Sequence, residues 1–277
     1  MVKQRLLLAC PDQPGLVALV TNLLAQAGAD IHELDEHAEA GKFAMRIVYS
    51  CAASEQDKIS LLMHQTSNAD WQLRIHAADH KPRVAILCSQ EDHCLADLLW
   101  RFKAGELSGK PVGIWSTQPL HHHLADAYAV PLHHTPVGDG GMPVHERTLL
   151  NQLDGQVDLI ILARYMRILS ENFLQEADVP VINIHHSFLP AFIGANPYQE
   201  AHERGVKLIG ATAHYAIPEL DAGPIIEQDV VRVAHRQTPE QLRELGRDVE
   251  RVVLARAVRA HLEDRVVVWD NRTVVFG

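Results

Sequence analysis

The sequence contains no apolar run that approaches the roughly 18 residues of a membrane-spanning helix. Near its start, only residues 6–9 separate Arg5 from Cys10, fewer than the roughly 7–15 apolar residues of a secretion signal. Lys and Arg form no dense run and the formal net charge is −10, so a nucleic acid is not expected as the main partner. These absences predict a cytoplasmic protein that contacts neither membrane nor nucleic acid.

Cysteine is scarce and shows no C-x-x-C spacing; the four residues are Cys10, Cys51, Cys88 and Cys94. Their spacing predicts reduced thiols of a cytoplasmic protein rather than a disulfide framework. The G-x-S-x-G turn that presents a nucleophilic serine is also missing. Histidine runs at 121–123 and 133–134 have no partnered Cys or Asp at ligand spacing, so no metal is expected there.

What is present begins with a regular pattern over residues 1–80, where short apolar runs and helical spacing alternate as βαββαβ. This order predicts a ferredoxin-like domain. The polar segment 78–83, which contains Pro82, marks its end. Because a lone unit of this kind leaves a sheet face or edge uncovered, we expect copies of the chain to pair through it into a homo-oligomer.

Residues 81–277 show short, almost wholly apolar strands separated by helices. That pattern predicts an α/β, Rossmann-like domain with a mostly parallel sheet covered on both faces. After Pro190 the strands lengthen and favour antiparallel pairing, and a helix is expected from Pro239 to about Leu262. A pair of strands around Asn271 ends the chain.

The apolar strand "VPVIN" leads into Asn183, Ile184 and His185. Residues two apart on a strand share a face, so the side chains of Asn183 and His185 project together. At the carboxyl end of a parallel strand they would form a donor pair suited to an oxyanion. The alternative is that Asn183 caps the following turn and His185 only ends the strand.

Two longer segments give these residues a context. "NIHHSFLPAFIGANPYQEA" and "IGATAHYAIPELDAGPII" resemble the motifs of formyltransferase-fold enzymes that bind 10-formyltetrahydrofolate. The histidine after His185, "SFLPAFIGANPY" and the tail from "GRDVERVVLARAV" to "DRVVVWDNRT" more closely resemble the formyltetrahydrofolate deformylase family. The resemblance covers essentially the whole chain and implies a hydrolase of one-carbon metabolism that supplies formate for purine biosynthesis. The folate is then the substrate, and no cofactor is implied.

The resemblance also implies roles for particular residues. Asn183, His185 and Asp221 of the "LDAGPI" loop match the catalytic set. Contacts to the folate are implied for "ARYMRIL", whose backbone holds the pterin in such enzymes, and for neighbouring loops, namely Arg164, Met166, Arg167, Ile168, Leu169, His214, Leu220 and Gly223. The first 80 residues are similar to an ACT domain, a regulatory module that receives amino-acid ligands at a turn matching Asp12, Gln13, Pro14 and Gly15.

These residue types suit hydrolysis of a formamide. Attack on the formyl carbon gives a tetrahedral oxyanion, to which Asn183 and protonated His185 can donate, while Asp221 keeps the imidazole charged and orients water. His186 faces away and is expected either to be structural or to support the residues that touch the substrate. Ser187 is not expected to be a nucleophile, and His214 either supports the pocket or is a buried strand histidine.

Three functions remain open at this point: hydrolysis, transfer to an amine such as methionyl-tRNA, and folate or amino-acid sensing without catalysis. Glycinamide ribonucleotide formyltransferases hold a phosphate in a glycine-rich loop after the first strand. Here that loop is "CSQEDHC", without glycine and with the acids Glu91 and Asp92, so it is a poor phosphate cradle. Ser116-Thr117-Gln118 also departs from the Ser-Asn-His common in the family, which affects only contacts near that strand end.

Overall fold

The structure is a computed structural model that describes residues 1–190 and 197–277. Residues 191–196, within the "SFLPAFIGANPY" motif, lie outside the described residues. The chain divides into two compact units, which are considered one at a time. The first unit consists of Met1–His80, Ala260–Trp269 and Thr273–Gly277, and the second of Lys81–Arg259 and Asp270–Arg272. Across the described ranges, no helix has the length and apolar character needed to cross a bilayer.

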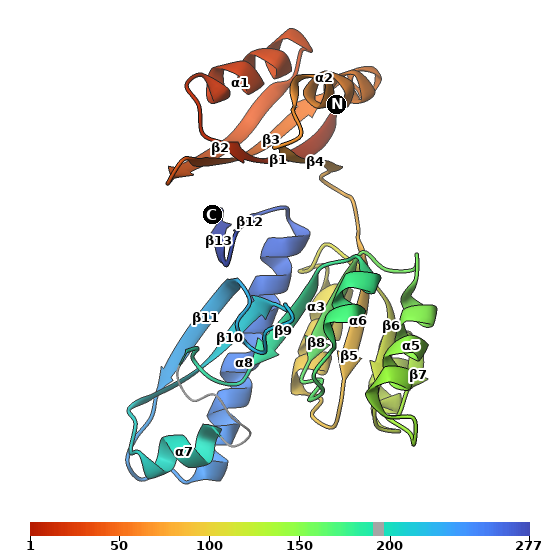
Figure 1. Cartoon of the computed structure of the whole chain (residues 1–277), viewed down its shortest axis with the longest axis vertical. Helices are drawn as coiled ribbons and strands as arrows, with labels where there is room; N and C mark the ends of the chain where they lie inside the picture. Colours follow the sequence, from red (N-terminus) through yellow and green to blue (C-terminus); the bar gives the residue numbers. More distant parts are fainter. Residues whose placement is uncertain (191–196) are drawn as a thin grey trace. The chain divides into compact units, whose positions relative to one another are not determined.

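The first unit contains the predicted ferredoxin-like arrangement. Its elements are β1 (Val2–Pro11), α1 (Leu16–Gln26), β2 (Asp30–Glu39), β3 (Lys42–Cys51), a 3-10 turn (Ala53–Glu55), α2 (Gln56–Thr66) and β4 (Gln72–Ala77). The strands pair antiparallel in the order β2-β3-β1-β4. Leu16, Val20 and Leu24 recur every four residues on α1 and pack with α2 against one face of the sheet (Figure 1). This order confirms the predicted topology.

The opposite face of this sheet is covered by the end of the chain itself. Strands β12 (Val266–Trp269) and β13 (Arg272–Val275) form a two-stranded sheet, and Val267, Trp269 and Phe276 pack against Leu7 and Ala9 of β1. Polar contacts reinforce this packing, since Arg5 pairs with Asp264 at 3.2 Å. The sequence placed all of residues 81–277 in the second domain, whereas the contacts assign 260–269 and 273–277 to the first unit.

The second unit is built on a seven-stranded sheet. Its elements are β5 (Arg83–Cys88), α3 (His93–Ala104), β6 (Lys110–Ser116), α4 (His122–Tyr128), β7 (Leu132–His134), α5 (Gly141–Leu153), β8 (Leu159–Ala163), α6 (Glu171–Ala177), β9 (Val181–His185), α7 (Pro197–Glu203), β10 (Leu208–Tyr215), β11 (Ile225–Arg232) and α8 (Pro239–Leu262). The last three residues of α8 belong to the first unit. Helix α7 was not predicted.

The sheet order is β11-β10-β9-β8-β5-β6-β7. Strands β5 to β9 run parallel, and β10 and β11 are antiparallel to their neighbours. Every residue of β8 is buried, as expected for a central strand covered on both faces. The structure therefore confirms the predicted mostly parallel α/β sheet. Ligands of such sheets bind beyond the carboxyl ends of the parallel strands, where β9 delivers Asn183 and His185.

Candidate active site

Two neighbouring strands bring the polar side chains of the candidate site to one face. On β9, Asn183 and His185 are two residues apart, and β10 pairs antiparallel with β9 so that His214 lies opposite Asn183. Directly opposite residues project to the same side of a sheet. The Asn183 amide Nδ2 is 3.2 Å from Nε2 of His214, and the other ring nitrogen of His214 lies 3.0 Å from the Tyr215 carbonyl oxygen.

Asp221 completes the group from the loop between β10 and β11. Its carboxylate lies 3.2 Å from Nδ1 of His185 and 3.8 Å from Nε2 of His214. Asp221 has a left-handed backbone with φ of 54°, which aspartate tolerates better than most residues. Gly223 lets the loop close, because a Cβ there would collide with the carbonyl oxygen of Tyr215. The structure thus brings the three predicted catalytic residues and His214 together.

The charge state of Asp221 follows from its surroundings. Burial alone would raise the pKa of this carboxyl group, but hydrogen bonds from His185 and His214 outweigh burial and hold the pKa well below its usual range. Asp221 is therefore a carboxylate near neutral pH. A fixed negative charge beside Nδ1 of His185 fixes the orientation of that ring.

The second ring nitrogen of His185 faces a neighbour that the sequence did not indicate. Nε2 of His185 lies 2.8 Å from Oγ of Ser187, and both residues are buried. His186 contacts the His185 ring edge-on, with centroids 5.3 Å apart. Burial and the nearby charge of Arg164 lower the pKa of His186 to about 4, so His186 is neutral at physiological pH.

A pocket adjoins these residues on the side of Asn183, His214 and Asp221. Five of the eight residues predicted to contact the folate line it, namely Arg167, Ile168, Leu169, His214 and Leu220. The segment that follows β8 supplies three of the five. Ile168 and Leu220 are exposed apolar side chains that a flat aromatic ligand can cover.

The other three predicted contacts are placed differently. Arg164 directs its guanidinium away to Glu250, with Nε 3.4 Å from the carboxylate, and Met166 is 52% exposed outside the lining. Gly223 serves the loop closure described above. Arg164 and Met166 both have positive φ, so the backbone turns sharply here before the segment reaches the pocket at Arg167.

Sequence reasoning missed a second group of polar side chains where the loop after β5 enters helix α3. His93 lies 2.8 Å from the Glu250 carboxylate, and Glu91 of the same loop is paired with Arg247 at 2.8 Å. The negative field expected from "CSQEDHC" is therefore partly neutralised. No spacing in the sequence links residues 93, 164 and 250. The burial of Glu250 on α8 becomes visible only in the structure.

Several other polar residues noted in the sequence have contacts of their own, away from Asp221. Nε2 of His121 contacts the Ser89 carbonyl oxygen at 2.7 Å, and His133 stacks on Trp115 with centroids 4.7 Å apart. Thr117 is bonded to Ser89 at 3.1 Å. In the first unit, the turn formed by Asp12, Gln13, Pro14 and Gly15 is exposed. Gly15 has φ of 91°, a left-handed conformation that favours glycine.

Comparison with known proteins places this geometry in a family. The formyl transferase family model matches residues 82–258. A formyltetrahydrofolate deformylase of Synechocystis is 47% identical over 98% of this chain and 98% of its own length. The crystal structure of a formyltetrahydrofolate deformylase from Pseudomonas syringae has a TM-score of 0.93 and 43% identity, covering 100% of this chain and 95% of that one. A glycinamide ribonucleotide transformylase from Symbiobacterium toebii has a TM-score of 0.67 and 29% identity, covering 73% and 97%.

The match to the family model covers more than half of the chain, and it coincides with the unit that carries Asn183, His185 and Asp221. The chain therefore belongs to the formyl transferase family. The similarity to formyltetrahydrofolate deformylases is more specific, because it covers 98–100% of this chain, whereas the transformylase match covers 73%. Within the family the chain belongs to the formyltetrahydrofolate deformylases, which confirms the resemblance seen in the sequence.

Proposed function

We propose that the chain hydrolyses 10-formyltetrahydrofolate to formate and tetrahydrofolate. The observation that carries this proposal is the convergence of Asn183, His214 and Asp221 on the wall of a pocket lined by the segment after β8, with His185 paired to Asp221. Full-length similarity to formyltetrahydrofolate deformylases supports the same reaction. The protein is an enzyme, and its folate is a substrate rather than a cofactor.

In the proposed reaction, the oxygen of a water molecule attacks the formyl carbon while Asp221 accepts a hydrogen bond from that water. The tetrahedral oxyanion receives a hydrogen bond from the Asn183 amide. Donation from Nε2 of His185 requires this nitrogen to exchange its Ser187 partner for the formyl oxygen. The proton that the attacking water loses passes through Asp221 to N10 of the folate, the C–N bond breaks, and formic acid leaves and gives its remaining proton to solvent as it becomes formate. Every proton transfer uses water, folate or this chain's own side chains, and no cofactor or metal is invoked.

The test is a formate assay on the full chain. Purified protein is incubated with 10-formyltetrahydrofolate, with a chelator present and no acceptor amine, and formate and tetrahydrofolate are measured. We expect both products in equal amounts. Disappearance of substrate without formate, or activity that requires an added amine or metal ion, would contradict the proposal.

The physiological setting is part of the same proposal. A cytoplasmic deformylase would return tetrahydrofolate to one-carbon metabolism and supply formate for purine biosynthesis. The net charge of −10 and the absence of a membrane-crossing helix among the described residues agree with a small-molecule substrate. Deleting the gene should create a formate requirement for growth under conditions where purines are made, and wild-type growth without formate would count against this role.

For the first unit we propose a regulatory and assembly role. The exposed turn at residues 12–15 is the proposed place for an amino-acid effector. Edge strand β2 is exposed along almost its entire length and supports pairing with a second chain, although its acidic residues make a flat self-pairing costly at neutral pH. Sedimentation of the full chain should show a homo-oligomer, and one of the twenty amino acids should raise its melting temperature.

A further inference from the structure

Residues 164–170, between β8 and α6, form one wall of the pocket that Asp221 borders. Arg167, Ile168 and Leu169 line this pocket, and the Ile168 side chain is 64% exposed, so the middle of the segment is open to a ligand. The segment is neither helix nor strand. Its shape therefore depends on contacts with the elements around it.

Two residues near the start of the segment have a left-handed backbone. The φ angle of Arg164 is 60° and that of Met166 is 23°, and residues other than glycine adopt such angles only at a cost in energy. Backbone conformations of this kind persist where the surrounding structure holds them. The segment therefore needs anchors, and buried polar side chains supply them at both of its ends.

The anchor at the end of the segment is Glu146 of α5, which is 7% exposed. One of its carboxyl oxygens accepts a hydrogen bond from the backbone N–H of Ser170 at 2.7 Å, and the other accepts from the Ser170 hydroxyl, also at 2.7 Å. The hydroxyl oxygen in turn accepts from the backbone N–H of Phe173 at 3.1 Å and caps α6. Loss of Glu146 would leave two polar groups of one residue without these acceptors, so Glu146 fixes the position of Ser170.

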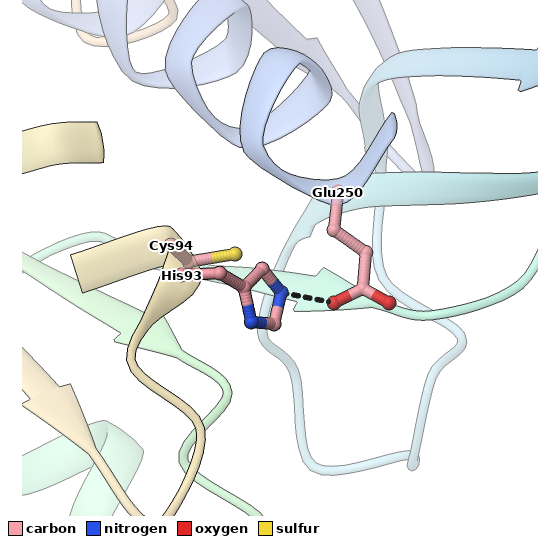
Figure 2. Close-up of side chains that lie close together, drawn as sticks. All are labelled: His93, Cys94 and Glu250. Atoms are coloured by element: carbon pink, nitrogen blue, oxygen red, sulfur yellow. Dashed lines mark hydrogen bonds and ion pairs between the residues drawn. The ribbon is translucent and has the colours of Figure 1, made fainter. Parts of the chain in front are cut away.

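The anchors at the start of the segment hold Arg164 and Tyr165. Nε2 of His145, also on α5, contacts the Tyr165 hydroxyl, and the two buried rings are stacked with their centroids 6.2 Å apart. Nε of Arg164 lies 3.4 Å from the carboxylate of Glu250 on α8, and Figure 2 shows the His93 ring directed at the same carboxylate. Helix α5 thus holds the segment near both ends through two adjacent residues.

Apolar packing alone does not account for these two residues of α5. Tyr165 and Leu169 pack in an apolar cluster that includes Leu149, one turn further along α5. Apolar side chains at positions 145 and 146 would extend that cluster without needing polar partners, whereas buried polar groups are costly unless they are hydrogen-bonded. The chain instead has a histidine and a glutamate there, and their contacts end on the two ends of the pocket wall.

We propose that His145 and Glu146 are positioning residues that hold residues 164–170 in the shape that binds the folate. Neither lines the pocket, so they act through Tyr165 and Ser170. The apparent dissociation constant of a ligand rises as the fraction of protein with a competent site falls. Folate affinity therefore depends on these anchors, whereas the chemical step does not. This inference rests on the proposed function for the identity of the ligand and adds which residues outside the pocket shape its wall.

The experiment separates binding from chemistry in the full chain. Formate release from 10-formyltetrahydrofolate gives kcat and KM, and calorimetric titration gives the Kd of tetrahydrofolate. Glu146→Ala removes both bonds to Ser170, Tyr165→Phe removes only a hydroxyl, and the conservative Glu146→Gln keeps an acceptor for the Ser170 N–H. The matched control is Glu176→Ala, which removes from α6 a carboxyl group that pairs with Arg147 of α5 at 2.9 Å. Circular dichroism and urea unfolding establish which variants are folded.

Glu146→Ala should raise both KM and the Kd of tetrahydrofolate at least about tenfold while kcat stays within about threefold of the wild-type value. Tyr165→Phe should raise KM and Kd about threefold or more, because it removes a single neutral hydrogen bond. Glu146→Gln should recover most of the affinity, and Glu176→Ala should bind like the wild-type protein. In folded variants, a merely structural role would leave KM and Kd unchanged.

The inference holds only if every folded variant among Glu146→Ala and Tyr165→Phe binds tetrahydrofolate more weakly than the control. Wild-type affinity in either of them would overturn it, and so would a fall in kcat at unchanged KM. If Glu146→Ala does not fold, Tyr165→Phe decides the matter.

The proposed function can fail separately. Binding of tetrahydrofolate without release of formate would contradict hydrolysis, while the titrations would still test the anchors. If the wild-type protein does not bind tetrahydrofolate at all, both proposals fail.

Discussion

Two carboxylates of the second unit, Asp221 and Glu250, are each paired with histidine but serve in different surroundings. The Asp221 side chain is 12% exposed, borders the pocket and contacts His185 and His214. The Glu250 side chain is 1% exposed and is enclosed by His93, Arg164 and Tyr198. Both have lowered pKa values. A carboxylate–histidine pair is thus a candidate for catalysis only where a substrate can reach it.

The largest effect on turnover is expected at Asp221, the carboxylate that borders the pocket. Asp221→Asn keeps the side chain's size but removes the charge beside His185, so single-turnover hydrolysis should slow by about 10²–10⁴. Folate affinity, measured by titration, should change little because the pocket's other walls remain. A variant with wild-type turnover would remove Asp221 from the mechanism.

A double variant serves as the control for that comparison. His185→Asn should slow hydrolysis to a similar extent, and Asp221→Asn with His185→Asn should lose less than the product of the two single factors, because the pair acts as one unit. Fully multiplicative losses would show that the two side chains act independently despite their 3.2 Å separation.

The next effect tests the oxyanion donor. Asn183→Ala removes the amide that lies 3.2 Å from His214, and turnover should fall by about 10²–10³, the usual loss for one such donor. The exposed Asn151 of α5, changed to Ala, is the matched control and should leave turnover unchanged. A slower reaction in both variants would indicate a general loss of folded protein.

The third prediction concerns His186, whose ring contacts those of both His185 and Tyr198. Its pKa of about 4 in the folded chain is below the ordinary value near 6.5 of an unfolded chain. Between these values the unfolded chain binds a proton that the folded chain does not, so the free energy of unfolding decreases as pH falls from about 6.5 to 4. The loss attributable to His186 is at most about 3 kcal/mol.

Urea unfolding at pH 6.5 and pH 4 measures this loss. In His186→Asn the histidine contribution is absent while the carboxylates still titrate, so the variant should lose less stability over this interval than the wild-type chain. Equal losses in the two proteins would mean that His186 is not held neutral by burial and Arg164.

How far the sequence predicts this molecule depends on the range of the contacts. Apart from helix α7, the order of strands and helices follows from local periodicity, as do the sheet type and the shared face of Asn183 and His185, and the structure agrees with these. The packing of the C-terminal strands against β1 does not follow from local periodicity, because it joins residues that are nearly the whole chain apart. The one local signal is β1, whose residues are buried on both faces although helices cover only one.

The same reasoning explains the outcome at the site. Asp221 was reached through its motif, while Glu250 was missed because its partners come from α3, α7 and the turn after β8. Arg164 was predicted to contact the folate because it belongs to "ARYMRIL", which resembles the segment whose backbone holds the pterin. Its positive φ, which no spacing reveals, directs the side chain to Glu250 instead.

The smallest effect is expected at Ser187, which the sequence suggested is not a nucleophile and which the structure places 2.8 Å from Nε2 of His185. Ser187→Ala removes that contact but leaves Asp221 on Nδ1, so the ring keeps its main anchor. Nε2 of His185, no longer held by Ser187, can then donate to the formyl oxygen without first giving up a partner. This gain offsets the loss of one contact that orients the His185 ring. Turnover in single-turnover experiments should therefore stay within about tenfold of the wild-type value. Loss as deep as that of Asp221→Asn would instead assign the hydroxyl a proton-transfer or nucleophilic role, and trapping of a formyl ester on Ser187 would distinguish the two.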